Sequence, residues 1–141
     1  AGLRVGYLLG APALAGRLRA RQPYYHVNLA AQLAARAALD DLGWLRERAA
    51  ALVRGRATLA AALGALPGLR VYPSAANFLL VACAAGQRDA LWAGLLDRGI
   101  LTRRFETPRL ADCLRITVGT PEEHARLLAA LRELLAAEAR P

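Results

Sequence analysis

The sequence contains neither lysine nor methionine. All 19 basic residues are therefore arginine, against 11 acidic residues, and the net charge is +8. Arginine stays protonated at neutral pH and is a poor nucleophile, so the absence of lysine excludes covalent chemistry on a side-chain amine of this chain. Because the chain also has no initiator methionine and opens on Ala1-Gly2-Leu3-Arg4-Val5, we expect a fragment truncated at its N-terminus.

Metal ligands, nucleophiles and membrane spans are also scarce. His26 and His124 are isolated, so we predict no metal site. Cys83 and Cys113 lie in apolar runs without a CxxC partner, which predicts buried thiols in a reducing, cytoplasmic setting. The single serine, Ser74, lies in a predicted turn and has no base beside it. No apolar run is long enough to span a bilayer, and nothing resembles a signal peptide.

The basic charge leaves several classes of partner open. A pI near 10.9 is compatible with nucleic acid, a membrane surface or a small anionic substrate. The arginines are spread along the chain, however, and only Arg17, Arg19 and Arg21 approach a cluster. Aromatic residues are 6% of the chain, and no zinc-finger or RNP-like pattern is present. We therefore expect no nucleic-acid or membrane partner, and a basic nucleic-acid-binding module is a distant alternative.

The first half of the chain is mainly helical by pattern. A short strand is predicted over Val5–Leu9, followed by a helix over residues 12–21 that begins with proline. Asn28 is a plausible N-cap for a second, alanine-rich helix over Leu29–Leu39. Leucines at mostly helical spacing then predict a long helix over Trp44–Leu66, which Pro67-Gly68 ends.

The second half changes to alternating strands and helices. The patterns predict strands over residues 69–72, 77–82, 100–104 and 114–118, a helix over 87–98, and a polar loop over 105–112. Thr120-Pro121-Glu122-Glu123 is a capping box that starts a final amphipathic helix. The order β-β-α-β-β-α predicts an α/β chain with an α+β small domain, in which helices pack on a small sheet. The first half has a single predicted strand and cannot form a sheet by itself.

Two arginines lie on strands that are otherwise apolar. Arg115 stands inside Leu114–Val118, and Arg103 follows Ile100-Leu101-Thr102. Burial of a guanidinium is costly without an anionic partner, and its planar fork fits a carboxylate or a phosphate. The two side chains could therefore converge on one anion. The alternative is that both reach water from the edges of their strands.

Three segments carry a resemblance to a known family. Residues 99–103, 114–123 and 73–81 resemble the closing segments of histidinol-phosphate aminotransferases, which are fold-type I enzymes of the class I and II aminotransferase family. Residues 1–7 look like the strand that follows the lysine that binds pyridoxal 5'-phosphate (PLP) in such enzymes. The resemblance implies that residues 1–43 are a remnant of the large PLP-binding domain. Residues 44–141 would be the small C-terminal domain.

The resemblance also implies roles for three arginines. Arg4 matches the arginine that binds the PLP phosphate. Arg115 matches the arginine that holds the anionic group of the substrate, and Arg103 matches a second arginine at the phosphate site. The family is a homodimer and binds PLP through a Schiff base with a lysine. Because this chain has no lysine, it is predicted to be inactive alone, although the parent protein is predicted to be an enzyme.

The implied reaction transfers an amino group between glutamate or 2-oxoglutarate and histidinol phosphate or imidazole-acetol phosphate. Threonine-phosphate decarboxylase and aromatic aminotransferases are similar and remain alternatives. In each case the partner is a small amino acid or a phosphate-bearing amine. No role is assigned to Tyr24, Tyr25 or His26, which lie where the family has a loop near its dimer interface.

Overall fold

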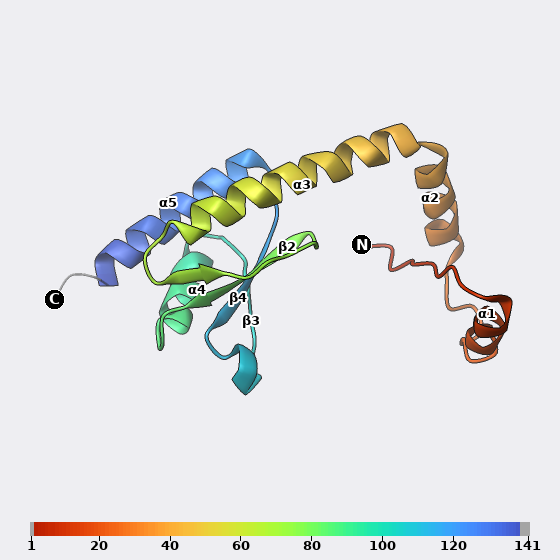
Figure 1. The fold of residues 1–141 in the computed structure, drawn as a ribbon, viewed down its shortest axis with the longest axis horizontal. Coiled ribbons are helices and arrows are strands. Elements are labelled where there is room, and N and C mark those ends of the chain that lie inside the picture. Colours follow the sequence, from red (N-terminus) through yellow and green to blue (C-terminus); the bar gives the residue numbers. More distant parts are fainter. Residues whose placement is uncertain (1, 139–141) are drawn as a thin grey trace. The chain divides into compact units, whose positions relative to one another are not determined.

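The computed structural model describes residues 2–138, and its elements follow the predicted order (Figure 1). The helices are α1 (Pro12–Arg19), α2 (Leu29–Asp40), α3 (Leu42–Gly64), α4 (Arg88–Asp97) and α5 (Pro121–Glu138), with a 3-10 turn at Pro108–Leu110. The strands are β1 (Leu69–Val71), β2 (Phe78–Cys83), β3 (Arg103–Arg104) and β4 (Cys113–Thr117). No helix within residues 2–138 is long and apolar enough to cross a membrane.

Contacts divide the chain into two compact units, one up to Arg48 and one from Ala49 onward. In the first unit, Asn28 caps α2 as predicted, since its Oδ1 accepts a hydrogen bond from the amide of Ala31 at 2.8 Å. The predicted strand at Val5–Leu9 is wrong, because residues 4–11 pair with no strand. A strand needs a neighbour to satisfy its backbone, and the four strands of the described chain all lie in the second unit.

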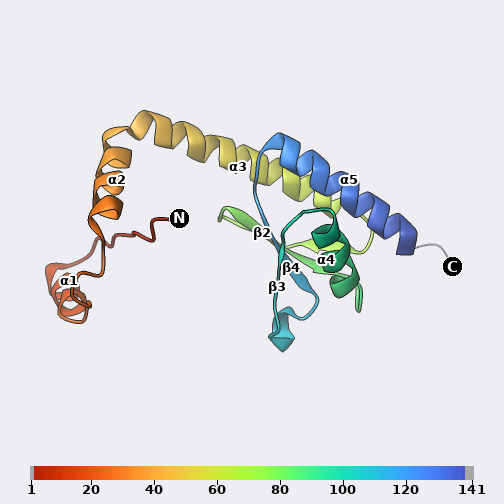
Figure 2. The same ribbon diagram turned by 180° about the vertical axis from the view of Figure 1, so that it is seen from behind.

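The second unit is built on a four-stranded antiparallel sheet in the order β1-β2-β4-β3. Strand β3 lies at the edge of this sheet, next to β4 (Figure 2). Side chains alternate between the two faces of a strand, and β2 follows this rule: Leu79, Val81 and Cys83 are buried, whereas the residues between them are partly exposed. One face of the sheet therefore forms the core, and the other is open.

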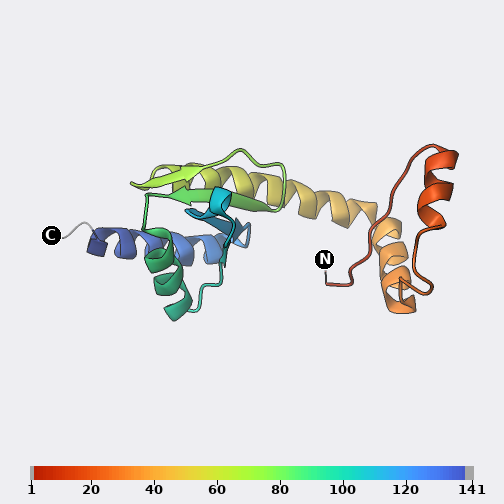
Figure 3. The same ribbon diagram turned by 90° about the horizontal axis from the view of Figure 1, so that it is seen from below.

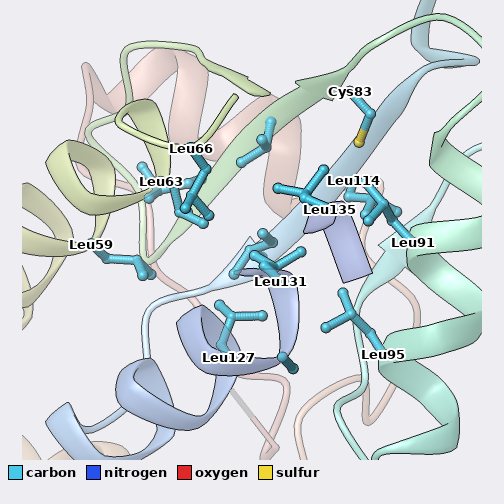
Figure 4. Packing of buried hydrophobic residues seen from close by; sticks show 14 residues of the cluster. Leu59, Leu63, Leu66, Cys83, Leu91, Leu95, Leu114, Leu127, Leu131 and Leu135 are labelled. Atoms are coloured by element: carbon cyan, nitrogen blue, oxygen red, sulfur yellow. The ribbon is translucent and has the colours of Figure 1, made fainter. Parts of the chain in front are cut away.

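Three helices bury leucines against the core face (Figure 4). Helices α4 and α5 lie on the same side of the sheet (Figure 3). The core unites residues of α3, β2, α4, β4 and α5 with Leu66 of the turn after α3: Leu59, Leu63, Leu66, Leu79, Val81, Cys83, Leu91, Leu95, Leu114, Ile116, Leu127, Ala130, Leu131 and Leu135. Cys113 is also buried, so both cysteines are buried as predicted. The predicted small sheet with packed helices is confirmed.

Local signals mark where α4 ends and where α5 begins. The amide of Thr120 donates to Glu123 Oε2 at 2.7 Å, and the amide of Glu123 donates to Thr120 Oγ1 at 3.3 Å, which confirms the predicted capping box. After α4, Gly99 adopts a φ of 70°, the left-handed conformation that glycine adopts without strain.

Strand β3 is shorter than the predicted strand at residues 100–104. The amide of Ile100 donates to the carbonyl of Leu95 at 2.9 Å and so belongs to the end of α4. The carbonyl of Thr102 accepts a hydrogen bond from Trp92 Nε1 at 3.2 Å. Because these backbone groups bond elsewhere, only Arg103 and Arg104 are left to pair with β4.

Candidate anion-binding site

The structure brings together two of the three predicted site residues. Arg103 of β3 lies directly opposite Arg115 of β4, and Arg115 lies opposite Leu80 of β2. Residues directly opposite across an antiparallel pair point to the same face, with Cβ atoms about 5 Å apart. Since Leu114 and Ile116 point into the core, Arg103 and Arg115 occupy the open face of the sheet.

Aromatic rings lie beneath both guanidinium groups. The guanidinium carbon of Arg115 is 5.2 Å from the ring centroid of Phe78, and that of Arg103 is 5.5 Å from the ring centroid of Phe105. A ring at this distance attracts a cation and limits the directions in which its planar fork can point. Arg115 is partly buried and Arg103 is exposed, so one edge of the pair is accessible to a ligand.

The positive charge of the pair is not compensated within the part of the chain that the structure describes. The ion pairs found there involve other arginines: Arg48, Arg88, Arg98 and Arg104. Two guanidinium groups side by side repel each other unless an anion lies between them. Because each can form two parallel hydrogen bonds, the pair suits a carboxylate or, with its larger charge, a phosphate.

The next residue, Arg104, points to the opposite face. Its Nη1 is 3.1 Å from Asp89 Oδ1, and its guanidinium carbon is 4.4 Å from the ring centroid of Trp92, both on α4. Sequence reasoning missed these two residues of α4. The available signal was their spacing, since positions 89 and 92 share one face of a helix that precedes the arginine-bearing strand.

Arg4, the third predicted site residue, lies in the first unit. It is exposed and has a φ of 55°, an uncommon conformation for a residue with a side chain. Arg103 and Arg115 belong to the second unit. The role of Arg4 at a cofactor phosphate therefore stays a prediction.

Comparison with known proteins identifies the family. Residues 1–131 match the family described as "Aminotransferase class I and II". The chain belongs to this family. The histidinol-phosphate aminotransferase of Roseiflexus castenholzii is 46% identical over 138 residues, which are 95% of this chain and 37% of that protein. The chain thus spans little more than a third of the length of such a relative.

Solved structures agree with the family and the fold. The histidinol-phosphate aminotransferase of Sinorhizobium meliloti, in complex with pyridoxal-5'-phosphate, matches 98% of this chain and 38% of its own, with a TM-score of 0.79 and 29% identity. The L-threonine-O-3-phosphate decarboxylase of Porphyromonas gingivalis matches 96% of this chain and 42% of its own, with a TM-score of 0.76 and 26% identity. The predicted relation to fold-type I aminotransferases is confirmed.

The residues of this chain fit one end of PLP only. Arginines such as Arg4 suit a phosphate group, but the chain has no lysine to hold the aldehyde end of the cofactor. The pair Arg103 and Arg115 lies on an open sheet face. The residues that line a recess of about 620 Å³ between α3 and β1 include neither Arg103 nor Arg115. The arrangement of Arg103 and Arg115 is compatible with a carboxylate or a phosphate on the open sheet face.

Proposed function

We propose that this chain is part of an enzyme that transfers an amino group between glutamate or 2-oxoglutarate and histidinol phosphate or imidazole-acetol phosphate. The observation that carries the proposal is the placement of Arg103 opposite Arg115 without a carboxylate partner among residues 2–138. Glutamate, 2-oxoglutarate, histidinol phosphate and imidazole-acetol phosphate each carry a carboxylate or a phosphate. A pair of arginines binds groups of this kind.

Each arginine has a distinct part in the proposal. Arg115, partly buried and stacked near Phe78, holds the anionic end of the substrate, and Arg103 provides the second cation when that end is a phosphate. Together they orient the substrate, because a two-point contact fixes its direction as well as its position. Arg4 binds the phosphate of PLP. When bound, PLP supplies an electron sink for the substrate carbanion.

The proposal includes the domain roles that the resemblance implied. Residues 1–43 belong to a large cofactor-binding domain and residues 44–141 to a small domain of a cytoplasmic homodimer. Support comes from the relatives, which are named as histidinol-phosphate aminotransferases and are more than twice as long as this chain.

A second candidate is decarboxylation of a phosphorylated amino acid. It is favoured by the structural match to the L-threonine-O-3-phosphate decarboxylase, whose TM-score of 0.76 is close to the 0.79 of the aminotransferase. Threonine phosphate carries both a phosphate and a carboxylate, so the same two arginines suit it. The products distinguish the candidates, because decarboxylation releases carbon dioxide and amino transfer does not.

The test uses the complete gene product that contains this sequence, loaded with PLP. We expect L-histidinol phosphate to be deaminated and 2-oxoglutarate to be converted to glutamate. Arg115→Gln should lower kcat/KM by about 10²-fold, since a hydrogen-bonded charge contact is lost, and Arg115→Lys should recover part of it. Arg98→Gln is the matched control, because Arg98 pairs with Glu133 away from the open sheet face and should leave kcat/KM unchanged.

Two results would contradict the proposal. Release of carbon dioxide from threonine phosphate, without amino transfer to 2-oxoglutarate, would favour the second candidate. Equal kcat/KM values for Arg115→Gln and Arg98→Gln would show that the open sheet face does not bind the substrate.

A further inference from the structure

Strand β3 is too short to place Arg103 by strand pairing alone. It pairs with β4 through two residues, Arg103 opposite Arg115 and Arg104 opposite Leu114, and within residues 2–138 no strand pairs with its other side. A pairing of this length supplies few ladder hydrogen bonds, each with a small net contribution to stability. The position of Arg103 must therefore depend on other contacts.

The sequence of β3 also specifies its register poorly. A shift of one residue moves every side chain of a strand to the opposite face. Because residues 103 and 104 are both arginine, such a shift would still place a guanidinium on each face. The sequence of residues 103 and 104 alone therefore does not determine which of these two arginines faces Arg115.

Helix α4 contacts the backbone on both sides of Arg103 and Arg104. Trp92 Nε1 donates a hydrogen bond to the carbonyl of Thr102 at 3.2 Å, and Arg88 Nη1 donates one to the carbonyl of Phe105. The two carbonyls immediately flank residues 103 and 104. Neither hydrogen bond involves the side chain of Arg103 or Arg104. The two hydrogen bonds together therefore fix the backbone register of β3.

Helix α4 also determines which of the two β3 side chains faces it. Asp89 accepts from Arg104 Nη1 at 3.1 Å, and the Trp92 ring lies 4.4 Å from the guanidinium carbon of Arg104. Arg88 is itself held by Asp89, with an Nη2–Oδ1 distance of 2.8 Å, and its side chain is only 11% exposed. Since Arg104 is held on the helix side, Arg103 is left on the open face opposite Arg115.

We infer that Arg88, Asp89 and Trp92 are positioning residues that set the register of β3 and thereby present Arg103 beside Arg115. They contact Arg104 and the backbone of β3, and they act on a ligand only through Arg103. The effect on substrate binding rests on the proposed function. The register of β3 is a property of the 141-residue chain and can be measured without it.

The first measurement is hydrogen exchange by mass spectrometry on the 141-residue chain. Arg88→Met and Trp92→Phe each remove a donor to the β3 backbone and keep much of the apolar side chain. We expect exchange in residues 102–106 to quicken about tenfold, with β2 changed by less than about twofold, as for loss of a hydrogen bond to one segment. Arg98→Met, an equal change of residue type at the other end of α4, should alter neither segment.

The second measurement is steady-state kinetics on the complete gene product. Arg88→Met should raise KM for the phosphate-bearing substrate roughly tenfold and leave kcat within about threefold, because Arg103 is misplaced while the reacting centre is untouched. A merely structural role would instead lower the amount of active enzyme and leave KM unchanged. The conservative variant Arg88→Lys, which keeps a donor, should recover part of the affinity.

The outcomes separate the two proposals. Unchanged exchange in residues 102–106, or equal acceleration in all strands, would overturn the positioning role whatever the substrate is. Failure of the wild-type gene product to act on histidinol phosphate would overturn the proposed function, and the exchange experiment would still decide the positioning role.

Discussion

At the scale of single residues, the arginines differ in the groups that surround them in the fold, and this difference is not evident from the sequence. Arg103 and Arg104 are adjacent and identical in type, yet one faces Arg115 and the other faces Asp89 and Trp92. Sequence reasoning found Arg103 and Arg115 because charged residues in apolar strands are unusual. It missed Arg88, since an arginine at the start of a helix is ordinary until its carbonyl partner 17 residues away is known.

Cys113 gives a prediction at this scale. Burial, reinforced by the nearby Asp112 carboxylate, raises the pKa of the Cys113 thiol above its ordinary value of 9.0. The thiol is therefore protonated at neutral pH, and we expect iodoacetamide to label Cys113 of the native chain far more slowly than after unfolding. The measurement is the alkylation rate of that cysteine as a function of pH.

The sign of the pH dependence follows from the same shift. The folded state keeps the proton at pH values where the unfolded state has lost it, so the free energy of unfolding decreases as pH rises through and above 9.0. Cys113→Ala should weaken this decrease. Labelling of the native chain with a midpoint below 9.0 would contradict the expected direction.

At the scale of elements, three helix ends were predictable, whereas both ends of α3 lie two residues before the predicted Trp44 and Leu66. Asn28, Gly99 and Thr120 each act where their residue types predict, because capping depends on a few neighbouring residues. The strand at Val5–Leu9 and the full length of β3 were not predictable in this way. Pairing depends on which other backbone groups are within reach, and local pattern does not contain that information.

The cap of α5 can be tested directly. Thr120→Ala removes the hydroxyl that accepts from the amide of Glu123, and we expect the free energy of unfolding to fall by about 1 kcal/mol. Thr107→Ala is the matched control, since Thr107 precedes the 3-10 turn but makes no capping hydrogen bond with its side chain. Urea unfolding should show a loss for the first variant only, and equal losses would argue against the cap.

The contact between α4 and α5 gives a second test. A Cβ atom at Gly94 would overlap the side chain of Leu134, whereas one at Gly55 would meet His124 and Val118 at an ordinary 3.5 Å. Alanine favours a helix over glycine by about 1 kcal/mol, so Gly55→Ala should stabilise the chain. Gly94→Ala should gain less or destabilise it, because Leu134 must move. Stabilisation by the same amount at both positions in thermal unfolding would contradict the close approach.

At the scale of the whole molecule, the family was recognisable from sequence and the complete site was not. The segments at residues 73–81, 99–103 and 114–123 carry the resemblance, and they include Arg103 and Arg115 of the open sheet face. The cofactor anchor could not be found, because no lysine occurs in the chain. The relation of Arg4 to the other two arginines also could not be deduced, since they belong to different compact units.

The purified 141-residue chain is therefore expected to be inactive. Without a lysine it has no group to anchor PLP covalently, and arginine cannot replace it at neutral pH. The measurement is formation of glutamate from 2-oxoglutarate with histidinol phosphate and added PLP. Turnover above the rate of free PLP would show that the chemistry does not need a lysine of the same chain.

The short length and the positive charge of β3 have a further consequence for association between chains. An edge strand exposes unpaired backbone groups that can template association with another chain. Here that edge is only two residues long, and both residues carry a full positive charge. A second copy that approached through this edge would bring like charges together, so the two arginines disfavour pairing of chains at the β3 edge of the sheet.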